Sequence, residues 1–551
     1  MSYNFLALFR KTILAFLLFL SANINAQSNG FETIRSIEMM DQIYENLDKY
    51  YVDEIQAGTL SKIAIDAMLK ELDPYTVYYH ESNIEDYQLM TTGQYGGIGS
   101  LIRQIGDFVF IAEPYEGSPS EKAGLRAGDK ILEIDGASME KKNSEEVSKA
   151  LKGPKGSVVK VFIERNEKER KTISITRDEI KLPDVPYSGM LDKTIGYIKL
   201  NSFTRTASKE VKNAFLDLKN NGMEQLILDL RGNGGGLLIE AVKIVNIFID
   251  KNQVVVNTQG RIQEENRTYI TLEEPSDIEI PIVVLIDGGS ASASEIVSGS
   301  LQDLDRAVIL GTRSYGKGLV QRTYDLDYGS KIKLTIAKYY TPSGRCVQRL
   351  EYYDKEEGES AEEIPDSLVT IFYTKNGREV IDGRGVEPDI KIEEKELSRL
   401  ALTIGRNNLF FDYATKYYYS HDTIPMAEEF SLRDEEYTAF KEYVLEHDFT
   451  YATASEEMLK KMKETSIKEG FYEDSQKQFD ALMEKVVPSK ERDLEKFKVQ
   501  IKQFLENEIV SRYYYQSGRA EYTFKNDPYI IKSMEVLQNK SIDKYDNILK
   551  N

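Results

Sequence analysis

The stretch that decides the fold is residues 282–321, IVVLIDGGSASASEIVSGSLQDLDRAVILGTRSYGKGLVQ. It begins with Ile282 to Ile286, an apolar run without alternation, which predicts a strand buried on both faces. Asp287-Gly288-Gly289 ends the run, and apolar residues then recur at helical spacing. The stretch therefore predicts a strand–turn–helix unit of an α/β domain, with small Ser and Ala residues at the start of the helix.

Two side chains in this stretch can act together chemically. Ser292 lies at the start of the predicted helix, and Lys317 lies in a turn between Gly316 and Gly318. A serine can serve as nucleophile when a neutral lysine takes its proton, and the N–H of Ala293, which points out of the helix start, can stabilise an oxyanion. The plainer alternatives are a helix cap for one of the serines and a surface lysine in a turn.

The lysine segment also has the spacing of a phosphate-binding loop, GxxxxGK, over residues 311–317. Such a loop needs Ser or Thr after the lysine and then a helix, whereas this chain has Gly318 and a run typical of a strand. A nucleotide site is therefore not expected.

The small number of histidines limits which residue can act as the catalytic base for the serine. The chain contains only His80, His421 and His447, so a Ser-His-Asp triad would have to recruit its imidazole from a flanking region. Lysine is the economical base, provided that burial lowers its pKa from about 10.4. With one cysteine and no HExxH motif, a His/Cys zinc site is not expected, and we predict no metal and no cofactor.

A second glycine-rich turn, Arg231-Gly-Asn-Gly-Gly-Gly236, follows the predicted buried strand 224–230 and precedes an apolar helix over 237–249. One interpretation is an ordinary strand-to-helix turn. The other is a second backbone N–H donor for the oxyanion, supplied by Gly235 or Gly236.

Four motifs in order resemble the carboxy-terminal processing, or tail-specific, proteases: DLRGNGGGLL (229–238), GSASASEIVSGSLQD (289–303), RSYGKGLVQ (313–321) and TPSGRCVQ (341–348). The resemblance covers roughly residues 35–395 and implies a ClpP/crotonase-like α/β core. It implies that Ser292 is the nucleophile, that Lys317 is the general base and that Gln321 orients this lysine. The oxyanion donors would be Ala293 and a glycine of the 232–236 turn. Asp303 matches an acidic position implicated in some members, and its alternative role is a hydrogen bond at the end of the helix.

Residues 94–180 resemble a PDZ domain, most clearly in SPSEKAGLRAGDKILEIDG. The backbone N–H groups of Gly97, Ile98 and Gly99 can bind a terminal carboxylate beside an apolar pocket. Some relatives have a positive residue after the PDZ helix that helps activation, and Lys152 is the candidate here. A PDZ domain placed before a Ser/Lys site predicts a reader of substrate tails.

Length and charge agree with this organisation. A chain of 551 residues has room for three or four domains, and a net charge of −20 argues against nucleic-acid binding. Arg10-Lys11 followed by the short apolar run 13–20 predicts a signal peptide, residues 1–26, and export to the periplasm or cell envelope of a bacterium. The alternative is an uncleaved N-terminal membrane anchor.

We therefore predict an α/β multidomain protein with a helical N-terminal region (27–93), a PDZ domain (94–180), a Ser/Lys protease core (181–396) and a helical C-terminal domain (397–551). The C-terminal domain is expected to be a packed bundle, or else a surface for a homo-oligomer or an adaptor protein. The predicted function is an exported serine endopeptidase that recognises the C-termini of unfolded or precursor proteins and cleaves them through an acyl-enzyme. The alternative is a non-catalytic protein that binds peptides or small ligands on the same scaffold.

Overall fold

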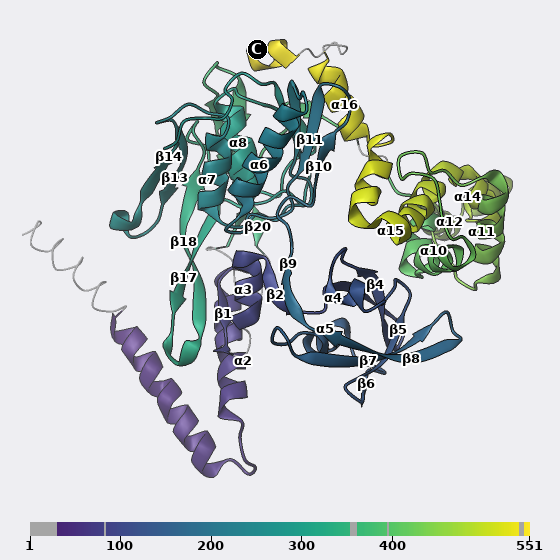
Figure 1. Cartoon of the computed structure of the whole chain (residues 1–551), viewed down its shortest axis with the longest axis horizontal. Coiled ribbons are helices and arrows are strands. Elements are labelled where there is room, and N and C mark those ends of the chain that lie inside the picture. The colour runs from purple at the N-terminus through teal and green to yellow at the C-terminus, as the bar shows by residue number, and fades with distance from the viewer. Residues whose placement is uncertain (1–29, 82–83, 353–360, 394–395, 539–544, 551) are drawn as a thin grey trace, which may run out of the picture. The chain divides into compact units, whose positions relative to one another are not determined.

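The computed structural model of the chain describes residues 30–81, 84–352, 361–393, 396–538 and 545–550 (Figure 1). The predicted signal peptide lies outside these residues. Within the described part of the chain, no helix combines the length and the apolar character that crossing a membrane requires. The described residues form two compact units. The first comprises the chain up to Glu81 together with Thr323–Leu334, and the second comprises Ser82–Arg322 and Thr335–Asn551.

The first unit contains a helix over residues 30–50, α2 (Ala57–Lys70) and the short strand β1 (Val77–Tyr79). β1 pairs antiparallel with the first residues of β18 (Lys331–Tyr340), and Val77 lies opposite Lys333. Asp73 makes the turn between α2 and β1, because its carboxylate accepts the backbone N–H groups of Tyr75 and Thr76, each at 2.8 Å. The N-terminal region is thus not wholly helical as predicted, because Pro74 cannot continue a helix and the residues after it pair with a distant strand.

In the second unit, the PDZ region is a small β-structure with two helices. A five-strand path runs in the order β3-β4-β5-β7-β8, β6 pairs with β5, and β2 pairs with β9. Alternate residues of β4 and β7, such as Val109, Ile111, Val159 and Val161, are fully buried, as expected for strands with one face on the core. Helix α3 (Ile84–Thr92) precedes the region, whose elements are β2 (Gln94–Gly97), β3 (Ser100–Ile105), β4 (Phe108–Pro114), α4 (Pro119–Lys122), β5 (Lys130–Ile134), β6 (Ala137–Ser138), α5 (Ser144–Leu151), β7 (Val158–Arg165), β8 (Glu169–Thr176) and β9 (Asp178–Lys181).

The core of the second unit is a six-stranded sheet in the order β10-β11-β12-β15-β16-β23. All its strands run parallel except β10, which is antiparallel to β11. Its strands and the helices between them are β10 (Tyr187–Met190), β11 (Ile195–Lys199), α6 (Ala207–Asn220), β12 (Gln225–Asp229), α7 (Leu238–Asn246), β15 (Ile282–Ile286), α8 (Ala293–Asp303), β16 (Val308–Gly311) and β23 (Ile390–Lys391).

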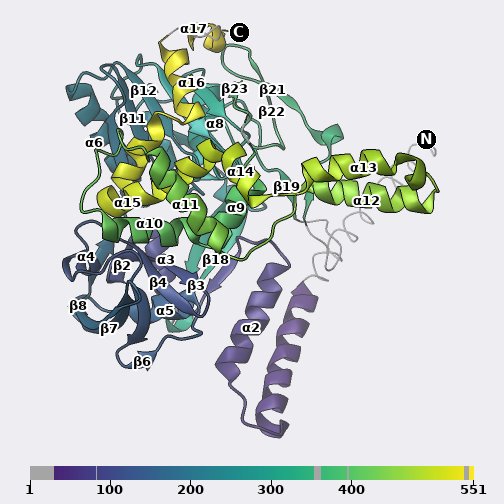
Figure 2. The ribbon, with the colours of Figure 1, turned by 90° about the vertical axis from the view of Figure 1, so that its right-hand side faces the viewer.

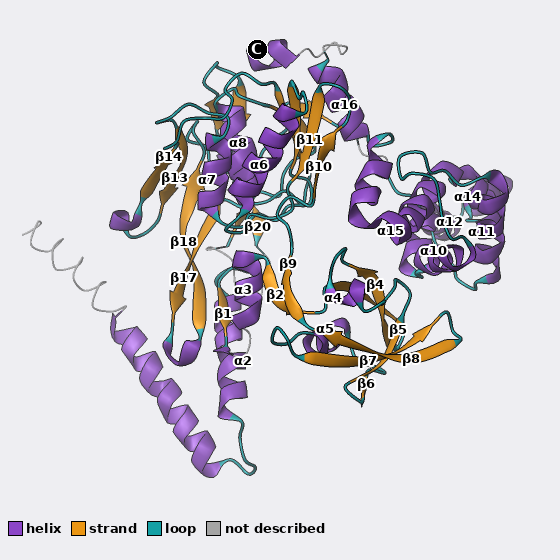
Figure 3. Ribbon diagram, in the orientation of Figure 1, coloured by secondary structure: helices purple, strands orange, loops and turns teal. Residues whose placement is uncertain are grey.

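Both faces of this sheet are covered, which explains its uninterrupted apolar strands. Side chains such as Leu226 and Leu228 pack with helices α6, α7 and α8, whereas Ile227 between them faces the opposite side (helices purple and strands orange in Figure 3). On that opposite side lie α16 (Pro528–Leu537) and α17 (Tyr545–Lys550), whose apolar residues join the same core. The C-terminal segment therefore closes the second face of the sheet.

The remaining strands form a separate antiparallel sheet and two short strand pairs. β18 pairs near its end with β13, where Tyr339 lies opposite Thr258, and β17 pairs with β18. These elements are β13 (Val254–Gln259), η2 (Gln263–Glu265), β14 (Arg267–Ile270), β17 (Leu319–Asp325), η3 (Asp327–Gly329), β19 (Leu350–Glu351), β20 (Glu362–Glu363), η4 (Asp366–Leu368), β21 (Ile371–Tyr373) and β22 (Glu379–Ile381).

The C-terminal region is helical, and α12 and α13 lie side by side in Figure 2. The long helix α15 is interrupted at Tyr515, which has φ 53° and ψ −152°. The predicted fold class, a PDZ domain before an α/β core with a helical C-terminal extension, is confirmed. The helices are α9 (Arg399–Arg406), α10 (Leu409–Ser420), α11 (Asp434–Glu446), α12 (Ala454–Lys468), α13 (Tyr472–Val486), α14 (Lys490–Lys496) and α15 (Lys498–Phe524).

Candidate active site

Ser292 lies at the sharp corner between β15 and α8. Its φ of 56° and ψ of −110° are uncommon for a residue with a side chain, and such conformations persist only where the surroundings hold them. The carbonyl oxygen of Asn233 accepts the N–H of Ala291 at 3.0 Å and the Ser294 hydroxyl at 2.9 Å. These bonds anchor the residues on either side of Ser292, so the corner holds a half-buried serine between two buried neighbours.

The glycine turn after β12 lies directly against this corner. Gly235 has φ 99°, and a Cβ on it would come within 2.9 Å of the Ser292 Cβ and 3.0 Å of the Ala293 nitrogen. The side chain of Asn233 holds the turn, since it donates to the Leu200 carbonyl and accepts the Gly235 N–H, both at 2.9 Å. Gly235 must therefore be a glycine for lack of space as well as for its backbone conformation.

The backbone donors predicted for the oxyanion differ in their present partners. The Gly235 N–H already donates to Asn233. Within the described residues, no hydrogen bond involves the N–H of Ala293 or of Gly236. Of the three predicted donors, these two N–H groups therefore have no hydrogen-bond partner among the described residues.

A residue that the sequence reasoning missed joins the serine corner to the lysine loop. Glu295 is completely buried in the first turn of α8. One of its oxygens, Oε2, accepts the N–H of Ser292 and the N–H of Lys317, each at 2.8 Å. Two nitrogens bound to one oxygen at 2.8 Å cannot be more than 5.6 Å apart (2 × 2.8 Å). The structure thus brings the backbones of the two predicted catalytic residues together.

The other oxygen of Glu295 also binds the lysine loop, and we call the four hydrogen bonds that Glu295 accepts the Glu295 clamp. Oε1 accepts the Ser314 hydroxyl at 2.6 Å and the Gly316 N–H at 2.7 Å. Burial raises the pKa of Glu295, while these hydrogen bonds oppose that rise. On the far side of the lysine, the Gly318 N–H donates to the side chain of Gln348 at 2.7 Å. The available signal for Glu295 was the S-x-x-E spacing from Ser292, which is typical of a helix capping box.

The remaining predicted residues of the core lie as follows. Lys317 is half-buried in the loop before β17. Gln321, in β17, donates through Nε2 to the Thr335 hydroxyl at 3.2 Å. Asp303 is at the opposite end of α8, about 15 Å along the helix from Ala293 at 1.5 Å per residue. There it is buried and accepts a hydrogen bond from the Arg345 guanidinium at 2.8 Å, so its position fits the alternative, structural role.

The predicted tail-binding loop of the PDZ region is held from one side by α4. Ser120 donates its N–H to the Ile98 carbonyl at 2.8 Å and its hydroxyl to the Gly99 carbonyl at 2.7 Å. No hydrogen bond from the N–H of Ile98 or Gly99 occurs among the residues that the structure describes. The Cα of Lys152 lies 3.9 Å from the place of a Cβ on Gly97, so this lysine is adjacent to the loop.

Comparison with known protein families identifies a PDZ domain, a protease domain and a C-terminal helical domain in this chain. Residues 194–352 match the model of peptidase family S41, residues 110–165 match a PDZ domain, and residues 400–537 match the C-terminal helical domain of probable PDZ-proteases.

Comparison with individual proteins gives relatives of the same kind. The chain is similar to a probable CtpA-like serine protease of Staphylococcus aureus, with 36% identity over 329 residues, 59% of this chain and 65% of that protein. A probable CtpA-like serine protease of Staphylococcus saprophyticus is 34% identical over 334 residues, which are 60% of this chain and 67% of the relative. The chain thus spans just under two thirds of the length of the Staphylococcus aureus relative and just over two thirds of that of the Staphylococcus saprophyticus relative. Among solved structures, a photosystem II D1 C-terminal processing protease matches with 28% identity and a TM-score of 0.36, over 64% of this chain and 86% of that one. The chain belongs to peptidase family S41, among the CtpA-like carboxy-terminal processing proteases, as its motifs predict.

Proposed function

We propose that the protein is a serine endopeptidase in which Ser292 is the nucleophile and Lys317 the general base. The observation that carries the proposal is the Glu295 oxygen shared by the N–H groups of Ser292 and Lys317. A shared acceptor of this kind keeps the backbones of the nucleophile and the base at a fixed separation before substrate binds.

In the proposed reaction, the neutral amine of Lys317 takes the proton of the Ser292 hydroxyl while Oγ forms a bond to the scissile carbonyl carbon. The carbonyl π electrons move to oxygen, and the N–H groups of Ala293 and Gly236 stabilise this oxyanion. When the tetrahedral intermediate collapses, the C–N bond breaks and Lys317 returns the proton to the leaving amine. Water then gives a proton to Lys317 as its oxygen bonds to the acyl carbon, which forms a second tetrahedral intermediate. When this intermediate collapses, the bond from carbon to Ser292 Oγ breaks, Lys317 returns the proton to Oγ, and the acid leaves. Gln321 orients the lysine throughout.

The proposed substrates are C-termini of unfolded or precursor proteins. The loop formed by Gly97, Ile98 and Gly99 would receive the terminal carboxylate, with Lys152 beside it as a further positive charge. The N-terminal segment 1–26 supports export to the periplasm or cell envelope. A homo-oligomer or adaptor surface on the C-terminal helices remains a prediction.

The proposal is tested with one unfolded protein carrying a free C-terminus, whose fragments are followed by mass spectrometry. Ser292→Ala and Lys317→Ala should each abolish cleavage, and the double variant should be no worse because the two groups act as a unit. Lys317→Arg should also fail, since arginine does not become neutral in proteins. Binding of the tail without cleavage by the unmodified protein would favour the alternative, a non-catalytic peptide-binding protein. Activity in Lys317→Arg would refute the lysine base.

A further inference from the structure

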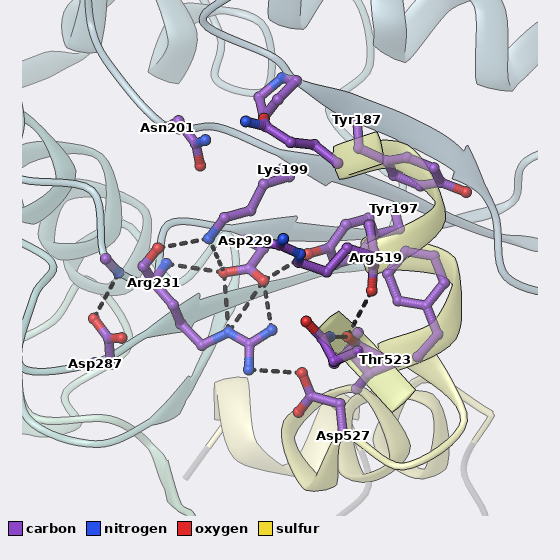
Figure 4. Close-up of a pocket in the computed structure, with 17 residues that line it drawn as sticks. Tyr187, Tyr197, Lys199, Asn201, Asp229, Arg231, Asp287, Arg519, Thr523 and Asp527 are labelled. Carbon is purple, nitrogen blue, oxygen red and sulfur yellow. Dashed lines mark hydrogen bonds and ion pairs between the residues drawn. The ribbon is translucent and has the colours of Figure 1, made fainter. Parts of the chain in front are cut away.

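A cavity of about 480 Å³ lies at the carboxyl ends of β11 and β12, where the C-terminal helices meet the core (Figure 4). Its wall is built from two parts of the chain that are far apart in sequence. The charged residues that line it are Lys199, Asp229, Arg231, Asp287, Arg519 and Asp527.

On the core side, the charged groups form a tight network around Asp229. This carboxylate is 1% exposed and accepts hydrogen bonds from the Tyr197 hydroxyl at 2.6 Å, Lys199 Nζ at 3.1 Å and Arg231 Nη2 at 2.5 Å. Although burial opposes ionisation, Arg231 and Lys199 hold the pKa of Asp229 below its usual range. Two half-buried cations thus share one buried anion, which leaves an excess of positive charge.

Asp527, from the C-terminal region, balances this excess. Its Oδ2 lies 2.8 Å from Arg231 Nη1, the nitrogen of the guanidinium that points away from Asp229 (Figure 4). The carboxylate is 7% exposed and its Oδ1 accepts the Tyr529 N–H at 2.9 Å, so it is fixed at the start of α16. The Tyr529 ring lies 4.7 Å from the guanidinium carbon and covers it. Without Asp527, Arg231 would keep Asp229 as a partner, but its Nη1 would lose its ion pair and Asp229 alone would face two cations, which disfavours this position of the guanidinium.

Arg231 is the first residue of the glycine turn that reaches the serine. Its carbonyl accepts Lys199 Nζ at 2.5 Å, and the next N–H, of Gly232, donates to Asp287 at 2.8 Å. The same turn places Gly235 within contact distance of Ser292. Movement of Arg231 would therefore be transmitted through a short, hydrogen-bonded turn to the backbone beside the nucleophile.

We infer that Asp527 is a positioning residue for the active site: the C-terminal helical region holds Arg231, and through it the Gly232–Gly236 turn, against Ser292. This inference rests on the proposed peptidase function. It gives the C-terminal region a role in the reaction itself, because the turn is held from both the core and α16. The turn that Asp527 supports through Arg231 lies beside the nucleophile, so the loss of Asp527 should lower kcat and leave KM nearly unchanged.

The test compares Asp527→Asn and Asp527→Glu with the unmodified protein and with a control, Glu535→Gln. Glu535 lies on α16, the helix that Asp527 caps, is 49% exposed, and among the described residues pairs only with Lys532, at 3.9 Å. Kinetics are measured on one unfolded substrate, with active sites counted by a fluorophosphonate that labels Ser292, so that unfolded molecules do not enter kcat. We expect Asp527→Asn to lower kcat about 10- to 100-fold, the scale of a displacement of about 1 Å. Asp527→Glu should recover part of the loss, and Glu535→Gln should match the unmodified protein.

A double-mutant cycle separates positioning from general destabilisation. In an Arg231→Gln background, Asp527→Asn should cause no further loss of kcat, because its effect acts through Arg231. Additive losses, or an unchanged kcat per active site in Asp527→Asn, would overturn the inference. Ser292→Ala is assayed in parallel: cleavage that depends on Ser292 upholds the proposed function whatever Asp527 does, and its absence overturns both.

Discussion

Replacing Glu295 with glutamine tests whether one buried carboxylate holds the nucleophile and the base together. Glutamine keeps one acceptor oxygen and replaces the other by an NH₂ donor. Two of the four donors that now bind Glu295 would then face another donor: either the N–H groups of Ser292 and Lys317, or the Ser314 hydroxyl and the Gly316 N–H.

The expected magnitude follows from these bonds. A hydrogen bond to a charged group contributes about 1.5–3 kcal/mol, so the loss of two costs about 3–6 kcal/mol of unfolding free energy. Burial raises the pKa of Glu295, and a neutral glutamine relieves that part of the cost. We therefore expect a loss near the lower end, about 3 kcal/mol. If either catalytic backbone shifts by about 1 Å, kcat should fall about 10²-fold.

A matched control exists in the neighbouring helix α7. Glu240 is also buried, at 2% exposure, and accepts the Ser208 N–H at 3.0 Å and Lys243 Nζ at 2.7 Å. Glu240→Gln should therefore lose comparable stability in urea unfolding and keep its kcat per active site. An unchanged kcat in Glu295→Gln would refute the clamp. An equal loss of kcat in both variants would assign the effect to weakened folding.

Three further predictions concern the turn, the tail-reading loop and pH. Gly235→Ala places a Cβ 2.7 Å from the Ala291 carbonyl oxygen, so the peptidase kcat of this variant should fall at least about 10²-fold. The control Gly234→Ala adds a Cβ in open space and should remain active, and equal activities of the two variants would contradict the packing argument. Amidating a substrate's C-terminus should lower kcat/KM by about one to two orders of magnitude, and equal rates for free, amidated and Asp-ended tails would rule out tail reading. Burial raises the pKa of Asp412 from 3.8 to about 6, so the folded state binds this proton more tightly and stability should rise as pH falls from about 6 toward 4. Asp412→Asn should make the midpoint of urea unfolding less dependent on pH between about 4 and 6. An unchanged pH dependence in this variant would contradict the raised pKa of Asp412.

Part of the site could be predicted from sequence because its signals are local. The apolar run 282–286 is the strand β15 without change, and the helix after it begins at Ala293, next to the predicted nucleophile. Family membership followed from four motifs in order. The role of Glu295 was not predicted, because its S-x-x-E spacing from Ser292 equally describes an ordinary helix cap. Only the folded chain shows that Glu295 also binds the lysine loop.

The sequence by itself determined the order of the domains and the buried parallel strands and led to the proposed Ser292/Lys317 pair, since each of these depends on local motifs and short periods. The tertiary structure alone decided which distant segments complete the site. β1 is a three-residue strand whose partner lies in β18, and such a strand has too few residues to show a period. The Arg231–Asp527 ion pair joins residues from opposite halves of the chain. Hydropathy predicts that charged residues lie at the surface, so a buried ion pair can be recognised only once folding has brought its two members together.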